Sequence, residues 1–430
     1  MKFIINTLGC KVNTYESNVM RDLLLNAGYK EAQENEKADI AIINTCTVTN
    51  TADSKSLKVI RHTIKENPNA IVIVTGCFSQ VNPDKLKDLE GVSIVLGNHD
   101  KSKIIEYLEK YKKENKQVSK IYKIDEVPFE SMKLNNFNKT RAFVKIEDGC
   151  ENFCSYCIIP YTRGKVRSKA VNDVLEEVTT LVNNGHHEIV LTGIHTGHYG
   201  ADLEKEDFAD LLELICKIEG LERLRISSIE ITELNDKFLN VLSKNPIIVD
   251  HMHIPLQSGC NKTLKDMNRK YDVNYFLNKI ETIRKIRPDM SITTDLIVGF
   301  PGETEEDFNE TIETIKKVSF SKIHVFPFSV RKGTVAEKMD NQIPENIKKE
   351  RVKKIIELSK ELEIKYMEKF IGKEVLFIPE TKREDYIIGH TGNYLLIKSK
   401  SSIELNHEAI KCKLDSVNYP YIIATIFDSE

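Results

Sequence analysis

Short apolar runs rich in β-branched residues alternate with amphipathic segments along the first part of the chain. Runs of this length, separated by helix-length segments, are typical of a parallel α/β sheet. We predict strands here at residues 3–7, 39–43, 70–74 and 92–96. From residue 101 to 135 the chain is rich in Lys and Glu and then loses its periodicity, which indicates a helix that runs into a linker.

The same alternation resumes six times in the middle of the chain, with candidate strands at residues 142–146, 188–192, 223–227, 251–255, 292–298 and 322–326. Six consecutive βα units predict a partial (βα)6 TIM-like barrel. A charged segment from Pro344 to Lys369 then carries apolar residues at helical spacing, and Gly372 follows it. Short β-rich runs at 375–378, 386–388, 394–398 and 422–427 predict a small β-barrel at the carboxy terminus.

The predicted fold class is therefore α/β, with three domains along the 430 residues. They are an amino-terminal parallel α/β sheet domain (1–125), a central partial barrel (136–368) and a small β-barrel domain (371–430). Hydrophobic residues make up 40% and charged residues 30% of the chain, a globular mixture that argues against a disordered or fibrous protein. Because no window approaches the ~18 apolar residues of a membrane span, we expect a cytoplasmic protein with no membrane partner.

Nine cysteines in a chain without an export signal favour metal or redox chemistry over a disulfide framework. Cys150, Cys154 and Cys157 form a C-x3-C-x2-C motif directly after the first predicted barrel strand. Three soft thiolates at this spacing can hold a [4Fe–4S] cluster and leave its fourth iron without a protein ligand. Zinc is the alternative, but it prefers four ligands, and the nearest further donors, His186 and His187, lie about thirty residues away.

Three more cysteines, Cys10, Cys46 and Cys77, follow three successive predicted strands of the amino-terminal sheet. Because the carboxyl ends of parallel strands meet at one edge of a sheet, we expect these thiols to converge and to hold a second cluster. The fourth strand ends at Gly97-Asn98 without a thiol, which again leaves one iron open. The alternative is that cysteine favours buried strand ends for packing alone.

These motifs resemble those of the radical S-adenosylmethionine (SAM) methylthiotransferases over nearly the whole chain. The resemblance rests on Thr7-Leu8-Gly9-Cys10, Asn44-Thr45-Cys46, Thr75-Gly76-Cys77, the C-x3-C-x2-C motif, and the barrel segments 255–259 and 299–304. Segments 372–375 and 389–394 are similar to a TRAM domain, a small RNA-binding β-barrel. The resemblance implies two [4Fe–4S] clusters and SAM as cofactors, with the six triplet cysteines as catalytic metal ligands.

The family resemblance also implies a set of SAM-binding residues in the cluster motif and in loops that follow the barrel strands. They are Tyr156, Gly193, Ile194, His195, Ser228, Glu230, Gln257, Arg269, Asp295, Val298 and Gly299. Turn and cap chemistry is the alternative explanation for the loop residues, and a surface ion pair is the alternative for Arg269.

The residues after Cys10 separate the branches of this family by substrate. Lys11-Val12-Asn13, with segments 15–17 and 46–49, resembles the branch that methylthiolates C2 of N6-threonylcarbamoyladenosine beside the tRNA anticodon, at position 37. The isopentenyladenosine branch, the ribosomal-protein branch and a non-catalytic iron–sulfur protein are alternatives. The resemblance implies as partners a tRNA anticodon loop, an external one-electron donor such as flavodoxin or ferredoxin, and a sulfide source.

The charge of the TRAM-like segment departs from a simple RNA-binding picture, because residues 371–430 contain 7 Lys or Arg against 9 Asp or Glu. Since phosphate contacts dominate affinity for nucleic acid, we expect shape and aromatic contacts, for example of Tyr386 and Tyr394, to contribute there instead. The candidate phosphate-binding residues lie just after the first cluster motif: Arg163, Lys165, Arg167 and Lys169. A solvated loop is the alternative for these four.

Overall fold

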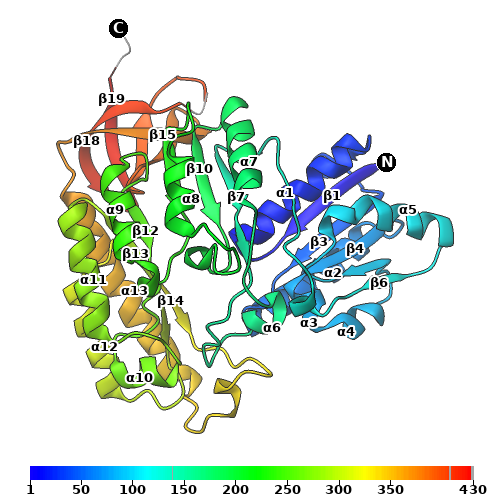
Figure 1. Cartoon of the computed structure of the whole chain (residues 1–430), viewed down its shortest axis with the longest axis horizontal. Coiled ribbons are helices and arrows are strands. Elements are labelled where there is room, and N and C mark those ends of the chain that lie inside the picture. Colours follow the sequence, from blue (N-terminus) through cyan, green and yellow to red (C-terminus); the bar gives the residue numbers. More distant parts are fainter. Residues whose placement is uncertain (138, 406–407, 428–430) are drawn as a thin grey trace.

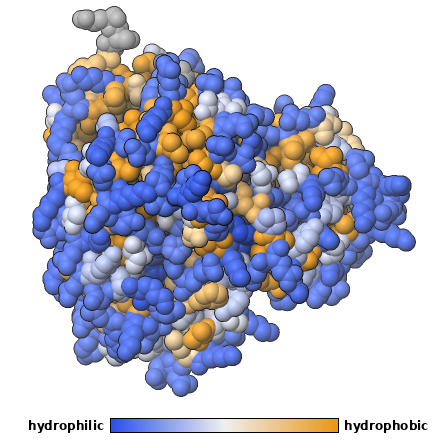
Figure 2. All heavy atoms as spheres, in the orientation of Figure 1, coloured by the Kyte–Doolittle hydropathy of each residue, from blue (hydrophilic) through white to orange (hydrophobic). Residues whose placement is uncertain are grey.

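The computed structural model describes residues 1–137, 139–405 and 408–427, so parts of the predicted segment 371–430 lie outside the described residues. In Figure 1 the amino-terminal unit lies at the right, the central barrel and its helices fill the middle and left, and a small barrel lies at the upper left. Hydrophilic residues cover most of the face seen in Figure 2, with hydrophobic residues in separate patches. Among the described residues, no helix combines the length and apolarity needed to cross a membrane.

The amino-terminal unit is a six-stranded parallel sheet in the order β2-β1-β3-β4-β5-β6, which confirms the predicted sheet type. Its strands are β1 (Lys2–Thr7), β2 (Lys30–Glu31), β3 (Ile40–Thr45), β4 (Ile71–Gly76), β5 (Ile94–Leu96) and β6 (Val118–Lys120). Its helices are α1 (Lys11–Asn26), α2 (Asn50–Glu66), α3 (Cys77–Val81), α4 (Pro83–Lys87) and α5 (Ile104–Glu114).

The sequence missed both edge strands of this sheet. Strand β2 is exposed throughout and β6 has one buried residue, so neither contains an apolar run that would mark it. The prediction that the helix in segment 101–135 runs into a linker is therefore partly wrong, because β6 follows α5 and pairs with β5.

The central unit is a partial barrel of six parallel strands. They are β7 (Arg141–Lys145), β10 (Glu188–Thr192), β11 (Arg223–Ile226), β12 (His251–His253), β13 (Ser291–Val298) and β14 (Lys322–Pro327). A bridge between Leu224 and Ile248 joins the two three-stranded halves. The predicted (βα)6 TIM-like architecture is confirmed.

Helices cover the outside of this barrel, and a short ribbon stands beside its first strand. The helices are α7 (Val171–Asn183), α8 (Phe208–Ile215), α9 (Asp236–Lys244), α10 (Asn261–Asp266), α11 (Val273–Ile286) and α12 (Glu305–Val318), whereas α6 (Ile159–Arg163) contacts α3 of the amino-terminal unit. The ribbon pairs β8 (Glu147–Asp148) with β9 (Arg167–Ser168). Apolar strand residues such as Leu224 and Ile226 pack with these helices in the main core, so the residues between them face the barrel interior.

The carboxy-terminal unit is a closed barrel in the order β15-β16-β17-β19-β18, as predicted. Helix α13 (Glu345–Glu368) leads into β15 (Glu374–Arg383), β16 (Tyr386–Thr391), β17 (Leu396–Lys400), β18 (Ile410–Asn418) and β19 (Tyr421–Ile426). The sequence missed β18, whose buried Cys412 and Leu414 alternate with exposed charged residues and form no continuous apolar run.

The small barrel packs against the amino ends of the central barrel strands. Arg141, at the start of β7, pairs with Glu380 at 3.0 Å, and Arg223 donates to the backbone oxygen of Leu376 at 2.9 Å. The ring of Tyr394 stacks on His251 and on His390, with centroid distances of 4.6 and 4.5 Å. Tyr394 thus helps to dock the small barrel within the chain, and its contribution to RNA binding stays a prediction, since the residue is still 36% exposed.

We expect Tyr394→Ala to destabilise the protein by about 1–3 kcal/mol, because it removes two ring stacks and the cation–π contact with Arg225. Tyr386→Ala is the matched control, since its ring contacts Lys398 at the surface of the same barrel and should cost less than about 1 kcal/mol. Thermal unfolding of both variants measures the difference. Equal losses would contradict a docking role for Tyr394.

Candidate functional site

The cysteines of the amino-terminal sheet come together at the carboxyl ends of its strands. Cys46 and Cys77 directly follow β3 and β4, and Cys10 ends the loop after β1. A Cβ at Gly9, whose φ is +100°, would lie 2.9 Å from the Cβ of Cys46, so glycine allows these loops to approach. Burial raises the pKa of Cys46 to about 11, and the neighbouring charges of Cys77 and Cys10 also act on it. The three thiols are neighbours in space.

Two side chains from outside the triplet contact Cys77. Arg163, from the barrel unit, places Nε 3.4 Å from the sulfur, and Asn98 places Nδ2 3.5 Å from it. Asn98 occupies the position after β5 that corresponds to the cysteines after β3 and β4. Its place at the strand end was the sequence signal for this contact.

Arg163 is fully buried and links the two units through a network of charges. It donates to Glu16 at 2.6 Å, to Asn13 Oδ1 at 2.7 Å and to Asp148 at 3.2 Å. Lys101 and Lys145 contact Glu16 at 2.8 and 2.9 Å. Beside this triplet, three buried cations, Arg163, Lys101 and Lys145, therefore contact two buried carboxylates, Glu16 and Asp148.

The pKa values of the two carboxylates follow from this arrangement. Burial alone would raise the pKa of Glu16, but the charges of Arg163, Lys101 and Lys145 hold it well below its ordinary value. Burial likewise opposes ionisation of Asp148, and Lys145 and Arg163 lower its pKa to about 2. The surplus positive charge suits an anionic group bound to the thiols, so this donor set and its surroundings fit an iron–sulfur cluster.

This burial corrects the prediction that four basic residues of the loop grip phosphate. Arg163 and Lys169 are fully buried, Arg167 is 9% exposed, and Lys169 pairs with buried Glu177. Lys165 alone of the four is exposed. The prediction was wrong for the other three because buried carboxylate and carbonyl partners, most of them outside the loop, already engage their charges.

The second triplet, Cys150, Cys154 and Cys157, lies in the loop between β8 and α6. Burial raises the pKa of Cys150 and Cys157 to about 12, and the charge of Cys154 acts in the same direction on both. None of the three is in a disulfide. Three crowded, half-buried cysteines ionise readily only when a cation neutralises them, so these donors also fit an iron cluster.

Arg269 and Glu230, both predicted to bind SAM, lie beside this triplet. Arg269 Nη1 is 3.3 Å from the sulfur of Cys154, and its other terminal nitrogen contacts Glu230. Tyr156 lies close enough that its charge and that of Arg269 affect each other. The structure thus joins three residues that the sequence places far apart, and their contact with SAM stays a prediction.

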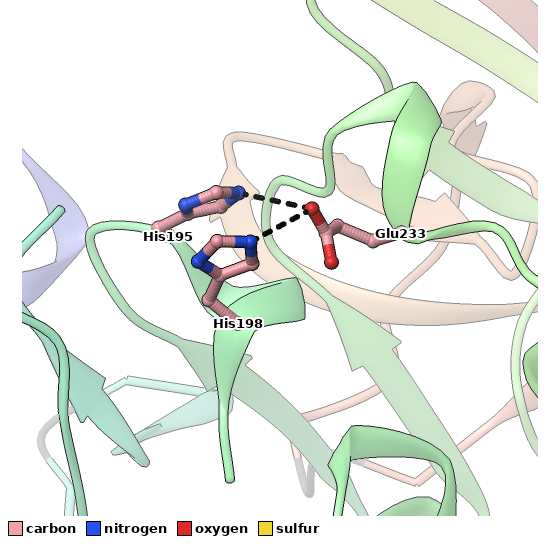
Figure 3. A group of neighbouring side chains, drawn as sticks. All are labelled: His195, His198 and Glu233. Carbon is pink, nitrogen blue, oxygen red and sulfur yellow. Dashed lines mark ion pairs between the residues drawn. The ribbon is translucent and has the colours of Figure 1, made fainter. Parts of the chain in front are cut away.

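His195 reaches the same triplet, with Nδ1 3.8 Å from the sulfur of Cys150. Figure 3 shows His195 and His198 pointing at Glu233, whose Oε1 lies 3.5 and 3.2 Å from their Nε2 atoms. These ligand types can hold a metal ion. Burial would raise the pKa of Glu233, but the two neighbouring histidines lower it to about 2. His195 therefore lies between Glu233 and Cys150, with one ring nitrogen near each.

The loop of Gly193 and Ile194 is held by Glu147, which sequence reasoning missed. A Cβ at Gly193 would lie 2.6 Å from the Glu147 carboxylate, which accepts a hydrogen bond from the backbone N of His195 at 2.7 Å. Glu147 is fully buried, and burial raises its pKa well above the ordinary value. Its position just before the Cys150 motif was the available sequence signal.

The remaining predicted SAM residues divide into two groups. Gln257 and Asp295 are joined by a backbone hydrogen bond of 2.9 Å, and both are half-buried, as is Ser228. Val298 is buried in the main core, and a Cβ at Gly299 would lie 2.4 Å from Lys348. Val298 and Gly299 are thus closely packed, and their contact with SAM stays a prediction.

Comparison with known proteins places this chain among tRNA-modifying enzymes. Residues 2–97 match the family described as uncharacterized protein family UPF0004, and residues 144–315 match the radical SAM superfamily. The chain is 42% identical to a threonylcarbamoyladenosine tRNA methylthiotransferase of Bacillus subtilis, with 97% of this chain and 94% of the relative covered. The same enzyme of Thermotoga maritima is 38% identical, with 96% and 97% covered.

A second kind of relative and a solved structure are also similar. A tRNA-2-methylthio-N6-dimethylallyladenosine synthase of Clostridium tetani is 40% identical over 83% of this chain and 80% of that protein. The radical SAM methyltransferase TsrM of Kitasatospora setae, with cobalamin and a [4Fe–4S] cluster bound, superposes with a TM-score of 0.55 at 12% identity, covering 76% of this chain and 74% of that one. At that identity the likeness supports the fold alone.

We expect the two triplets to hold iron independently, because they lie in different units. Changing Cys150, Cys154 and Cys157 to Ala should leave about half of the iron and labile sulfide of the reconstituted protein. Anaerobic iron and sulfide analysis measures this, with circular dichroism as the folding control. A folded variant without any iron would indicate one shared site.

Removing Arg163 should destabilise the protein strongly, because it leaves Glu16 and Asp148 buried without a main partner. We expect Arg163→Met to cost about 3–5 kcal/mol. Lys165→Met, an exposed change two residues away, should stay within about 0.5 kcal/mol. Chemical denaturation compares the two variants, and similar midpoints would show that the network does not hold the units together.

Proposed function

The chain belongs to the radical SAM methylthiotransferase family, and on that premise we propose that it attaches a methylthio group to C2 of N6-threonylcarbamoyladenosine at position 37 of tRNA. The similarity to threonylcarbamoyladenosine tRNA methylthiotransferases over nearly the full length of the chain carries this proposal. As a radical SAM protein, the chain uses SAM and a [4Fe–4S] cluster.

We assign the two triplets to two clusters. Cys150, Cys154 and Cys157 hold the cluster that binds SAM, and Cys10, Cys46 and Cys77 hold an auxiliary cluster. When bound, the first supplies the electron that cleaves SAM, and the second carries the sulfur that is transferred. Arg163 and Asn98 beside Cys77 support this assignment, because N–H donors stabilise sulfur that carries negative charge.

The side chains near the second triplet bind and orient SAM in this proposal. Arg269 is held by Glu230 at the sulfur of Cys154 and offers a guanidinium to the SAM carboxylate. Tyr156, the Gly193–His195 loop, Ser228, Gln257 and Asp295 complete the binding region. Val298 and Gly299 contribute to this SAM-binding region through the packing of the core rather than through side-chain contact with SAM.

The reaction also needs partners that the chain does not contain. These are the anticodon loop of a tRNA, a one-electron donor such as flavodoxin or ferredoxin, and a source of sulfide. The target base must leave the stack of the loop to be reached, as is usual for enzymes that act on a base.

Dimethylallyladenosine is the second candidate substrate, because a synthase that is named for it is 40% identical to this chain. The test is methylthiolation by the reconstituted protein of two anticodon stem-loops, one with each modified adenosine, followed by nucleoside mass spectrometry. Product on the threonylcarbamoyl stem-loop supports the proposal, and product on the dimethylallyl stem-loop alone would replace it.

The two triplets should be chemically separable. Changing Cys10, Cys46 and Cys77 to Ala should abolish methylthiolation but leave reductive cleavage of SAM to 5′-deoxyadenosine, because only the barrel triplet faces Arg269 and Glu230. Chromatography of both products under dithionite measures the two activities. A variant with an intact barrel cluster that cannot cleave SAM would contradict this division.

A further inference from the structure

A buried arginine without its full set of partners lies on the inward face of the central barrel. Arg225 stands between Leu224 and Ile226 of β11, whose side chains join the outer core, so it points to the interior. Its Nε donates to Glu188 at 2.7 Å, and the side chain is 2% exposed. Both terminal nitrogens of Arg225 are buried without a hydrogen-bond partner among the described residues. Such donors require a partner.

Lys11 adds a second positive charge at the same place. It is the first residue of α1, and its charge and that of Arg225 act on each other. Burial, followed by the charges of Arg225 and Arg141, lowers the pKa of its ammonium to about 8, and within the described part of the chain that ammonium has no ion pair or hydrogen bond. The first turn of α1 contains no acidic residue, so a cation here opposes the helix dipole. Helix stability therefore does not explain this lysine.

The acidic groups around these two cations are already engaged. Glu188 contacts Arg225 and Arg223, and Asp295 pairs with His253 at 3.3 Å. Glu380 pairs with Arg141, the other guanidinium that acts on Lys11. The inward face between α1 and β11 thus has a surplus of positive charge that an anionic ligand would balance.

His251 does not add to this surplus. It is buried on β12, and burial together with the charges of Arg225 and Lys11 holds its pKa well below the ordinary value. Neutral His251 instead stacks on Tyr394, whose ring also lies 4.8 Å from the Arg225 guanidinium. The docked carboxy-terminal barrel therefore supports the arginine from one side.

We propose that Lys11, with Arg225 as a second and buried charge, binds the carboxylate of the threonylcarbamoyl substituent and so selects this nucleoside over the dimethylallyl one. The inference rests on the proposed function. A threonylcarbamoyl group carries the free carboxylate of threonine, whereas a dimethylallyl group is an uncharged hydrocarbon. Hydrocarbon at this place would give no partner to the Lys11 ammonium or to the two free terminal nitrogens of Arg225, which disfavours it.

SAM also carries a carboxylate, so the experiment must separate the two sources. Lys11→Gln and Lys11→Arg are compared with Lys58→Gln, an exposed lysine of α2. The full chain with reconstituted clusters is given stem-loops with threonylcarbamoyladenosine, with its methyl ester, or with dimethylallyladenosine. Cleavage of SAM to 5′-deoxyadenosine without RNA is measured in parallel, with iron content as the control for the adjacent Cys10.

We expect Lys11→Gln to lower kcat/KM about 10–100-fold on the stem-loop with the free threonylcarbamoyl carboxylate, because a charge-assisted contact is lost. On the stem-loop with the methyl ester, the same variant should lower kcat/KM less than about 3-fold. Lys11→Arg should retain most activity, and Arg225→Gln should change selectivity in the same direction as Lys11→Gln. SAM cleavage should be unchanged in all variants.

Three outcomes would overturn the inference. If Lys11→Gln lowers kcat/KM equally on the acid and on the methyl ester, Lys11 has a structural role. If the variant cleaves SAM less well in the absence of RNA, the site binds the carboxylate of SAM instead. A wild-type enzyme that modifies the acid but does not prefer it over its ester would exclude recognition of the carboxylate while leaving the proposed function intact. Failure of the proposed function is seen separately, as a wild-type enzyme inactive on the acid and active on the dimethylallyl stem-loop.

Discussion

The buried contact of Glu16 with three cations is the constraint on which the arrangement of this protein depends. Lys101 comes from the amino-terminal unit, Lys145 from β7, and Arg163 from the end of α6, after the barrel triplet. Each of these charges is costly to bury alone, so all must meet at once. The observed docking of the sheet on the barrel satisfies that condition, and a displacement of either unit would separate Glu16 from its cations.

The same network connects the two cysteine triplets. Arg163 contacts Cys77 of one triplet and lies at the end of the helix that follows the other. A group held at the sheet edge therefore sits in a defined position relative to a group held in the barrel loop. Chemistry that uses two centres on one substrate needs such fixed geometry, because small displacements are costly in rate.

The fold alone does not explain the chemistry. TsrM shares this architecture at 12% identity and is named as a methyltransferase, whereas the relatives that match nearly the full chain are named as methylthiotransferases. Chemistry depends on the side chains that a fold carries, and in this chain Cys10 and Lys11 lie at the sheet edge and Arg225 in the barrel interior. The small barrel closes the amino ends of the strands and, through Tyr394, supports that interior.

The sequence by itself determined the elements and the cysteine positions, because both follow from local periodicity and from the repeat of βα units. It located the strands that carry apolar runs and missed β2, β6 and β18, which lack them. It could not assign the ion-pair partners of the charged residues, because nothing in the local sequence around Arg163, Lys169 or Arg225 identifies the carboxylate that each contacts. Only the tertiary structure decided that each is buried beside a particular carboxylate, because the charge environment of a side chain is built by segments that are remote in sequence.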